Sequence, residues 1–241
     1  MKRTVIFLFS CVLLLVSGCM KYAADRMAAD PMAEVLAIAT LRQDDTGFFL
    51  QVSDTESVEV INPEAIHFKP DTRCMVRYYI VSRTPNPPRS VVARVEWMEA
   101  IVTFDLSVAG GSASYDSPGG ETEVSSGRND PAPLEIRMDS WMTALEDGFL
   151  TLHYNVMSSG GKAHRFVLVQ GMNPQDPYEL HLEHYLNGDA PAYLEEGLVA
   201  FRLDGLPDTK GATVPLTLKY KSLNDSAKGE ASVRFDYRTR K

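Results

Sequence analysis

The sequence predicts an all-β protein built from two domains, a small closed barrel followed by an antiparallel β-sandwich. Two observations support this fold class. Apolar and polar residues alternate with a period of two along most of the chain, and turn-forming residues separate the alternating runs. No stretch of the body keeps a 3.6-residue period for more than about two turns, as a helix would require. Hydrophobic residues make up 44% and charged residues 23%, which is typical of a globular protein.

Residues 1–18 are typical of a bacterial signal peptide. Lys2 and Arg3 form a basic start, and the apolar run 4–16 that follows is too short to span about 30 Å of hydrocarbon comfortably. The run ends in Leu-Val-Ser-Gly-Cys, which looks like a lipobox with Cys19 as the residue that accepts diacylglycerol. We therefore expect acylated Cys19 to anchor the mature chain, since each buried CH₂ adds about 0.8 kcal/mol of membrane affinity. The alternative is an uncleaved single-pass anchor.

Residues 19–34, rich in Ala and charge, are expected to form the lipid anchor and a tether, and residues 35–109 the barrel. Three prolines within 84–89 interrupt this domain, and proline is excluded from the interior of a central strand ladder. About five strands suffice to close a small barrel. The expected strands are 48–52, 57–61, 74–81, 91–98 and 102–108.

Residues 110–130 contain eleven Gly, Ser or Pro residues and are expected to link the two domains. Alternation resumes after Pro131 and predicts a sandwich over 131–241. Pro215 indicates that its strand lies at a sheet edge. The seven expected strands are centred on 134–138, 150–156, 165–169, 180–186, 199–203, 214–220 and 231–237.

The chain resembles the NigD-like lipoproteins, a family known from Bacteroidota. The resemblance covers the whole chain and depends on four features. These are the lipobox at Cys19, the strand Met75-Val-Arg-Tyr-Tyr-Ile-Val81, the segment 139–154 (DSWMTALEDGFLTLHY), and the segment 178–189 (YELHLEHYLNGD). The resemblance implies an N-terminal OB-like barrel, a C-terminal β-sandwich and a suggested self-protection role linked to bacteriocin production. It implies no catalytic residues.

The order of charges after Cys19 bears on the location of the protein. Surface-exported lipoproteins of these bacteria tend to carry acidic residues directly after the lipidated cysteine. Here Lys21 comes first and Asp25 follows. We therefore expect the periplasmic face of the outer membrane, with surface exposure as the alternative.

The histidines offer one candidate metal site. His181 and His184 would share one face of a helix, but residues three apart in a strand point to opposite faces. A site there would need help from Glu179, Glu183 or His153, and His153 is expected on a solvated sheet face. The alternative to a metal ligand is that His184 ends an apolar stripe with a satisfied hydrogen bond.

Other chemistry finds little support in the sequence. There is no Gly-x-Ser-x-Gly motif, and Ser140 is expected in a turn or helix cap. Cys74 is expected to be a buried, inert thiol. Tyr78, Tyr79 and Trp97 are candidates for a ligand-binding aromatic platform, with core packing as the alternative for Tyr78 and Trp97.

The charge of the chain argues against nucleic acid as a partner. Removal of Lys2 and Arg3 takes the formal net charge from −8 to −10, whereas a duplex-binding protein needs a basic surface. We therefore predict a lipid-anchored, non-catalytic envelope module with no cofactor and no catalytic or metal-binding residues. It would bind or scaffold an envelope protein or a glycan. The alternative is a metal-assisted envelope hydrolase that uses His181, His184 and nearby carboxylates.

Overall fold

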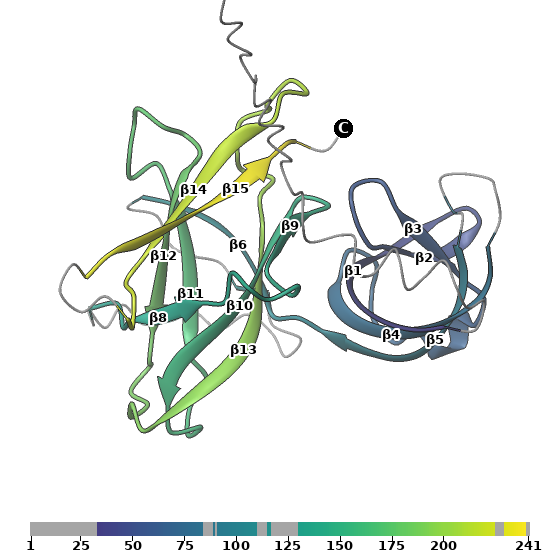
Figure 1. Ribbon diagram of the computed structural model, residues 1–241, viewed down its shortest axis with the longest axis horizontal. Coiled ribbons are helices and arrows are strands. Elements are labelled where there is room, and N and C mark those ends of the chain that lie inside the picture. The colour runs from purple at the N-terminus through teal and green to yellow at the C-terminus, as the bar shows by residue number, and fades with distance from the viewer. Residues whose placement is uncertain are drawn as a thin grey trace, which may run out of the picture.

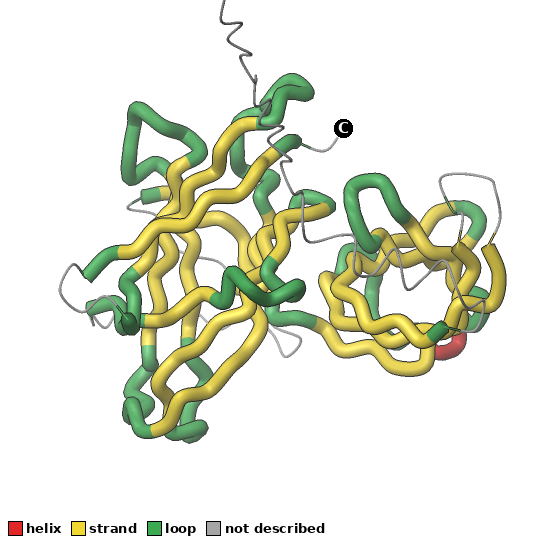
Figure 2. Tube along the Cα trace, viewed as in Figure 1, coloured by secondary structure: helices red, strands yellow, loops and turns green. Residues whose placement is uncertain are grey.

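The computed structural model describes residues 33–83, 89, 91–109, 115–116, 130–224 and 229–239. The signal peptide, Cys19, most of the tether and most of the 110–130 segment lie outside the described residues. Two β domains lie side by side, the barrel at the right of Figure 1 and the larger sheet at the left. Figure 2 shows that strands dominate both, with one short helical turn. The described ranges contain no helix of the length and apolarity that crossing a bilayer requires.

The N-terminal domain is a small closed barrel, as the sequence predicts, but one of its five strands, β1, was not among the expected strands. Its strands follow the order β1-β2-β3-β5-β4, and only the β3–β5 pairing is parallel. A 3₁₀ turn at Pro63–Ala65 follows β3. The strands are β1 (Glu34–Asp44), β2 (Gly47–Gln51), β3 (Ser57–Val60), β4 (Arg73–Arg83) and β5 (Val91–Ala100).

The barrel interior is filled by the inward-facing residues of the alternating runs, including Leu41, Leu50 and Ile80. Cys74 belongs to this core and is fully buried, with its thiol 3.3 Å from the Ala39 carbonyl oxygen. Burial raises the pKa of this thiol to about 12. The prediction of an inert, buried Cys74 is confirmed.

The second domain is a ten-stranded sheet that curls around its own core. The path runs β15-β14-β12-β11-β6-β13-β10-β8, with β7 paired to β6 and β9 paired to β10. Its two ends approach each other, because Leu134 of β8 bridges Ser222 just beyond β14. The strands are β6 (Thr103–Val108), β7 (Tyr115–Asp116), β8 (Leu134–Ile136), β9 (Ala144–Glu146), β10 (Phe149–Ser158), β11 (Arg165–Gln170), β12 (Glu179–Tyr185), β13 (Tyr193–Arg202), β14 (Val214–Tyr220) and β15 (Ala231–Tyr237).

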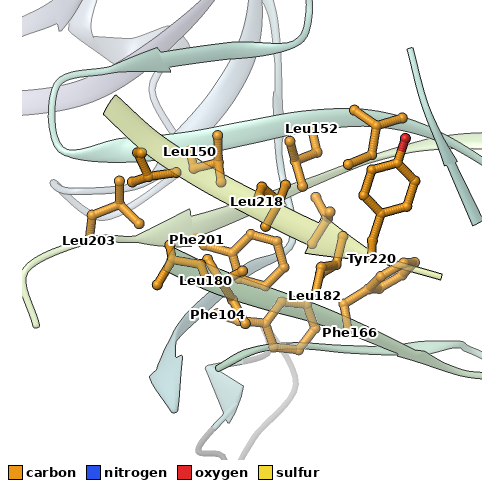
Figure 3. Packing of buried hydrophobic residues seen from close by; sticks show 14 of the residues in the cluster. Phe104, Leu150, Leu152, Phe166, Leu180, Leu182, Phe201, Leu203, Leu218 and Tyr220 are labelled. Carbon is orange, nitrogen blue, oxygen red and sulfur yellow. The ribbon is translucent and has the colours of Figure 1, made fainter. Parts of the chain in front are cut away.

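The sandwich core lies between the two curled halves of this sheet (Figure 3). Phe104 and Phe201 stack there with ring centroids 5.9 Å apart. Leu150 and Leu152 of β10 face Leu180 and Leu182 of β12 across the interior, and all four are buried. The alternating leucines of the sequence therefore mark the inner face correctly.

One strand belongs to a different domain from the one that the sequence indicated. Residues 102–108 were assigned to the barrel, but β6 lies in the sandwich between β11 and β13. Both of its pairings there are parallel, as is the β12–β14 pairing, so the sandwich is not wholly antiparallel. Alternation reports which side chains share a face and not which sheet a strand joins. The chain leaves the barrel at Ile101–Val102.

A buried polar network joins the two domains. Arg73 of β4 is 1% exposed, and its Nε donates to Thr151 Oγ1 of β10 at 3.1 Å. Its Nη1 lies 3.1 Å from Thr40 Oγ1, and its guanidinium stands over the Phe149 ring. Burial lowers the pKa of Arg73 to about 10, although Glu146 opposes this shift. The barrel and the sandwich are therefore docked through a specific side-chain contact.

Candidate functional site

The candidate site is a cleft of about 410 Å³ in the sandwich. Its floor is apolar and its mouth is charged, as is usual for a ligand site of this size. The lining comes from four strands and the loop before β11. The lining residues are Val102, Phe104, Tyr154, Val156, Ser158, Gly160, Lys162, Ala163, His164, Phe166, Glu195, Glu196, Leu198 and Val199.

The cleft lies where β6 begins, part-way along β13. β6 begins at Thr103, which pairs with Ala200 of β13, so β13 runs seven residues past that point. On the other side, β11 pairs with β6 only from Leu168. Because Leu168 pairs with Leu106, Arg165 at the start of β11 lies level with Thr103. The loop before β11 therefore lies opposite the first half of β13, and β7 pairs with Thr103 and Phe104 nearby.

Two aromatic rings form much of the floor. The rings of Tyr154 and Phe166 lie 4.6 Å apart at an angle of 46°. Tyr154 pairs across the strands with Gly197, and a Cβ at Gly197 would lie 2.6 Å from the tyrosine hydroxyl. Burial, with Glu195 as a smaller cause, raises the pKa of Tyr154 to about 12. The hydroxyl is therefore protonated near neutral pH.

Asp189 fixes the loops at one end of the cleft. Its carboxylate accepts hydrogen bonds from the Ser158 hydroxyl at 2.9 Å, the Ser159 N–H at 2.8 Å and the Ser159 hydroxyl. His164 Nε2 lies 3.2 Å from the same carboxylate. The Ser159 and Ser158 bonds together hold the pKa of Asp189 well below its usual range. The loop from β10 to β11 is thus tied to the turn after β12.

His164 connects Asp189 to a second, more buried histidine. His184 Nε2 lies 2.9 Å from His164 Nδ1, and the His184 ring stacks on Phe166 at 5.0 Å. Burial and the neighbouring His164 lower the pKa of His184 to about 4. The predicted hydrogen bond of His184 is present at Nε2, whereas its buried Nδ1 has no hydrogen-bond partner among the described residues.

The candidate metal pair is not brought together. His184 points into the sandwich, whereas His181 lies on the outer face of β12 beside Glu179, 3.2 Å away. Glu179 also pairs with Lys219 at 3.2 Å. Across the described ranges, no three His, Cys, Asp or Glu side chains cluster as metal ligands would. This geometry gives no support to the alternative of a metal-assisted hydrolase built on His181 and His184.

His153 and Ser140 meet, although His153 was expected on a solvated face. His153 is buried, with Nδ1 2.9 Å from Ser140 Oγ and Nε2 3.3 Å from a Glu196 carboxylate oxygen. Ser140 Oγ also accepts the Met142 N–H at 3.2 Å, as expected of a turn residue. Neither Ser140 nor His153 lines the cleft, and the Glu196 side chain is 69% exposed. These contacts hold His153 between the turn at Ser140 and Glu196 of β13.

The aromatic platform on the barrel is incomplete. Tyr78 is fully buried in the barrel core, so core packing is the correct interpretation for this residue. Tyr79 lies on the outer face, where its hydroxyl is 3.3 Å from Glu34. Trp97 is half-buried and pairs across the strands with Arg77 outside the barrel core, so core packing is wrong for Trp97.

Sequence reasoning missed the cleft and the role of Asp189. The Asn187-Gly188-Asp189 run forms a turn, in which Asn187 and Gly188 adopt positive φ values of 54° and 81°. The one available signal was the Ser-Ser-Gly-Gly run at 158–161, which supplies the Asp189 donors. The run does not close a hairpin, because β10 and β11 are not neighbours in the sheet.

Comparisons with known proteins agree with this architecture. Residues 118–237 match the family described as NigD-like C-terminal β-sandwich domains. Comparison with curated proteins returned no match. The solved structures in the following paragraph are less than 25% identical to this chain, so they establish a shared fold only.

A protein from Parabacteroides distasonis described as toxin-related is 23% identical, with a TM-score of 0.64 over 86% of this chain and 94% of its own. A NigD-like immunity protein from Bacteroides caccae is 20% identical, with a TM-score of 0.52 over 87% of this chain and 99% of its own. A protein from Bacteroides fragilis described as a lipoprotein is 11% identical, with a TM-score of 0.50 over 87% and 99%.

Proposed function

Residues 118–237 belong to the NigD-like family of C-terminal β-sandwich domains, and on that premise we propose that this protein is a non-catalytic binding module of the bacterial cell envelope. The observation that carries the proposal is the fold shared along almost the whole chain with a NigD-like immunity protein. The cleft supports it as well, because its apolar floor and charged mouth suit recognition of a ligand.

The proposed role is self-protection of a bacteriocin-producing cell. The module would bind an envelope partner or the toxic product before damage occurs. The structural likeness to a protein described as toxin-related is consistent with this role. A glycan partner is the alternative within the same class of function.

The protein would act from a membrane surface. Cys19 is the proposed lipidation site, and the likeness to a described lipoprotein supports an envelope location. The periplasmic face of the outer membrane is favoured by Lys21, with surface exposure as the alternative. Replacing Cys19→Ala should abolish palmitate labelling and release the protein from the membrane fraction. Continued labelling of the variant would refute Cys19 as the anchor.

Self-protection can be tested by deleting the gene in the producing strain. Spent medium from the parent should inhibit a lawn of the deletion strain but not of the parent. Wild-type protein should restore resistance, and the Cys19→Ala form should restore it less. Equal growth of both lawns would remove the self-protection role.

Binding can be tested in parallel by copurification of the cross-linked, lipidated protein from gently solubilised membranes. A stoichiometric protein partner would support an assembly or inhibitor module. Full recovery of the protein without a protein partner would favour a glycan.

A further inference from the structure

We propose that the cleft is a slot for one extended peptide strand with basic side chains, which adds to β13 on the edge facing away from β10, where no described strand pairs with the first half of β13. This inference rests on the proposed binding function and names its site and ligand class. The slot is defined by Lys162–His164 on one wall, residues 195–199 on the other, and the rings of Tyr154 and Phe166 as the floor.

The first argument is the length of the β13 edge. β6 pairs with β13 only from Thr103, which lies level with Ala200, so residues 193–199 of β13 extend beyond the start of β6. The cleft lies along these residues, and the loop before β11 forms its opposite wall. An added strand needs such a length of edge for its backbone hydrogen bonds.

The second argument is the direction of the backbone groups. The Ala200 N–H donates to the Val102 carbonyl at 2.9 Å, so the hydrogen-bonding groups of Ala200 face β6. Alternate residues of a strand face the same edge. The N–H and C=O groups of Leu198 and Glu196 must then face the slot, where no strand of the described ranges pairs with them. Free groups at this spacing match the backbone of an added strand.

The third argument is the chemistry of the walls. Side chains of an added strand alternate between two faces. One set would meet the apolar floor of Phe104, Tyr154 and Phe166. At the mouth, Glu195 and Glu196 are both exposed and point to opposite faces of β13, so a basic residue in either set meets a carboxylate. Lys162 is the one Lys or Arg among the cleft-lining residues, so acidic charge prevails there.

The test uses the full chain in detergent and two fluorescein-labelled peptides, Val-Lys-Val-Lys-Val-Lys and Val-Glu-Val-Glu-Val-Glu, each acetylated and amidated. The basic peptide should bind at least tenfold more tightly than the acidic one in fluorescence anisotropy. Binding should weaken with added salt, because exposed charges are screened. On binding, hydrogen exchange of the amides at 196 and 198 should slow.

Two variants separate charge from shape. The double variant Glu195→Gln and Glu196→Gln should bind the basic peptide at least tenfold more weakly than the wild type. The matched control, Glu59→Gln with Glu64→Gln, changes two exposed acids of the barrel and should leave the affinity unchanged. Ala163→Trp should block the slot while keeping both acids. A basic peptide with N-methylated alternate amides should bind at least tenfold more weakly, since it cannot pair with a strand edge.

The proposed slot would be refuted if the methylated and unmethylated peptides bound with equal affinity. It would also be refuted if the two double glutamate variants bound the basic peptide equally well. Absence of binding at millimolar peptide would refute it as well. None of these results affects the deletion experiment, so a producer that loses protection on deletion would keep the proposed function even without the slot. Conversely, peptide binding with no loss of protection would retain the slot and refute self-protection.

Discussion

Position 197 needs a glycine because the Tyr154 side chain leaves no room for a Cβ, and not because of its backbone conformation. It does not adopt a positive φ, yet a Cβ there would lie 2.6 Å from the hydroxyl and 2.8 Å from the ring of Tyr154. Tyr154 is held in turn by Phe166. A glycine beneath an aromatic ring on a neighbouring strand thus shapes the floor of the cleft.

Replacing Gly197→Ala should lower the free energy of unfolding by about 1–3 kcal/mol, the usual cost of overpacking. Tyr154→Leu should recover part of this loss in the double variant. Gly205→Ala is the control, because its nearest neighbour is the end of the flexible Gln170 side chain at 3.1 Å. Urea denaturation measures all three, and a Gly197→Ala protein of wild-type stability would contradict this account.

His184 makes the fold sensitive to mild acid. Its folded-state pKa is about 4, below the unfolded value near 6.5. Between these values the unfolded chain binds the proton more readily than the folded chain does, so protonation favours unfolding. Stability from this group is complete above about pH 6.5 and falls as the pH drops towards 4, by up to roughly 3 kcal/mol.

Urea denaturation at pH 7 and pH 5 should show this loss in the wild type and a much smaller one in His184→Gln. His181→Gln, on the outer face of β12, is the matched control and should keep the wild-type pH slope. Glu146 acts in the opposite sense, because burial raises its pKa to about 6 and favours the folded state at lower pH. Measuring both histidine variants in a Glu146→Gln background removes this contribution.

Beyond the end of β3, the side chain of Asn62 makes the two hydrogen bonds to the β5 backbone that a further strand residue would make. Asn62 follows β3, donates from Nδ2 to the Val95 carbonyl at 2.8 Å, and accepts the Val95 N–H at Oδ1 at 2.9 Å. Val95 lies beside the irregularity where β5 slips against β4 between Arg77 and Tyr78. The side chain therefore continues the ladder where the backbone cannot.

Asn62→Ala should destabilise the barrel by about 2–4 kcal/mol, because two buried backbone groups of Val95 would lose their partner. Asn62→Asp should also be costly, since a carboxylate cannot donate to the Val95 carbonyl. Asn173→Ala, which removes a turn bond of 3.1 Å to the exposed Gln175 N–H, should cost less than half as much. Equal losses at Asn62 and Asn173 in chemical denaturation would refute the ladder role.

Pro215 lies in a strand that has a neighbour on each side, where proline is usually excluded because it has no backbone N–H to donate. The prediction of an edge strand is wrong, because β14 lies between β15 and β12. The Thr217 N–H faces β12 and donates to the Tyr178 carbonyl, so Pro215, two residues earlier, faces the same side. The β12 ladder begins only at Thr217. The missing N–H therefore points where no ladder bond is made.

At the scale of the whole molecule, one arginine of the barrel pairs with two carboxylates of different exposure, one in each domain. Arg42 of the barrel meets Asp147 of the β9–β10 turn at 2.9 Å, and that side chain is fully buried. It also pairs with Asp71, which is 61% exposed. The Asp147 N–H in turn donates to Asp54 of the barrel at 2.7 Å. The turn is thus held by the barrel from two sides.

Asp147→Asn should lower the free energy of unfolding by about 1.5–3 kcal/mol, as expected for a buried bond to a charged group. Asp71→Asn should cost at most about 1 kcal/mol, because solvent screens an exposed pair. Both residues have positive φ values, 54° and 66°, which asparagine tolerates, so backbone strain is matched. Equal losses in denaturation experiments would contradict the role of burial in docking.

The sequence by itself determined the fold class, seven of the eight strands after Pro131 and the burial of Cys74. Each follows from a local rule, because alternation with a period of two assigns every side chain to a face of its own strand. The opposite directions of His181 and His184 follow from the same rule. The resemblance to NigD-like proteins could also be found from the sequence, because it depends on short motifs that are visible in a single chain.

Only the tertiary structure decided which strands pair. The placement of β6 between β11 and β13, the cleft below Thr103 and the row from Asp189 through His164 to His184 all join residues far apart in the chain. No local pattern in the sequence indicates that Arg73 is buried between the domains. An alternating pattern is compatible with many partners, and the choice among them depends on packing and register across the whole molecule.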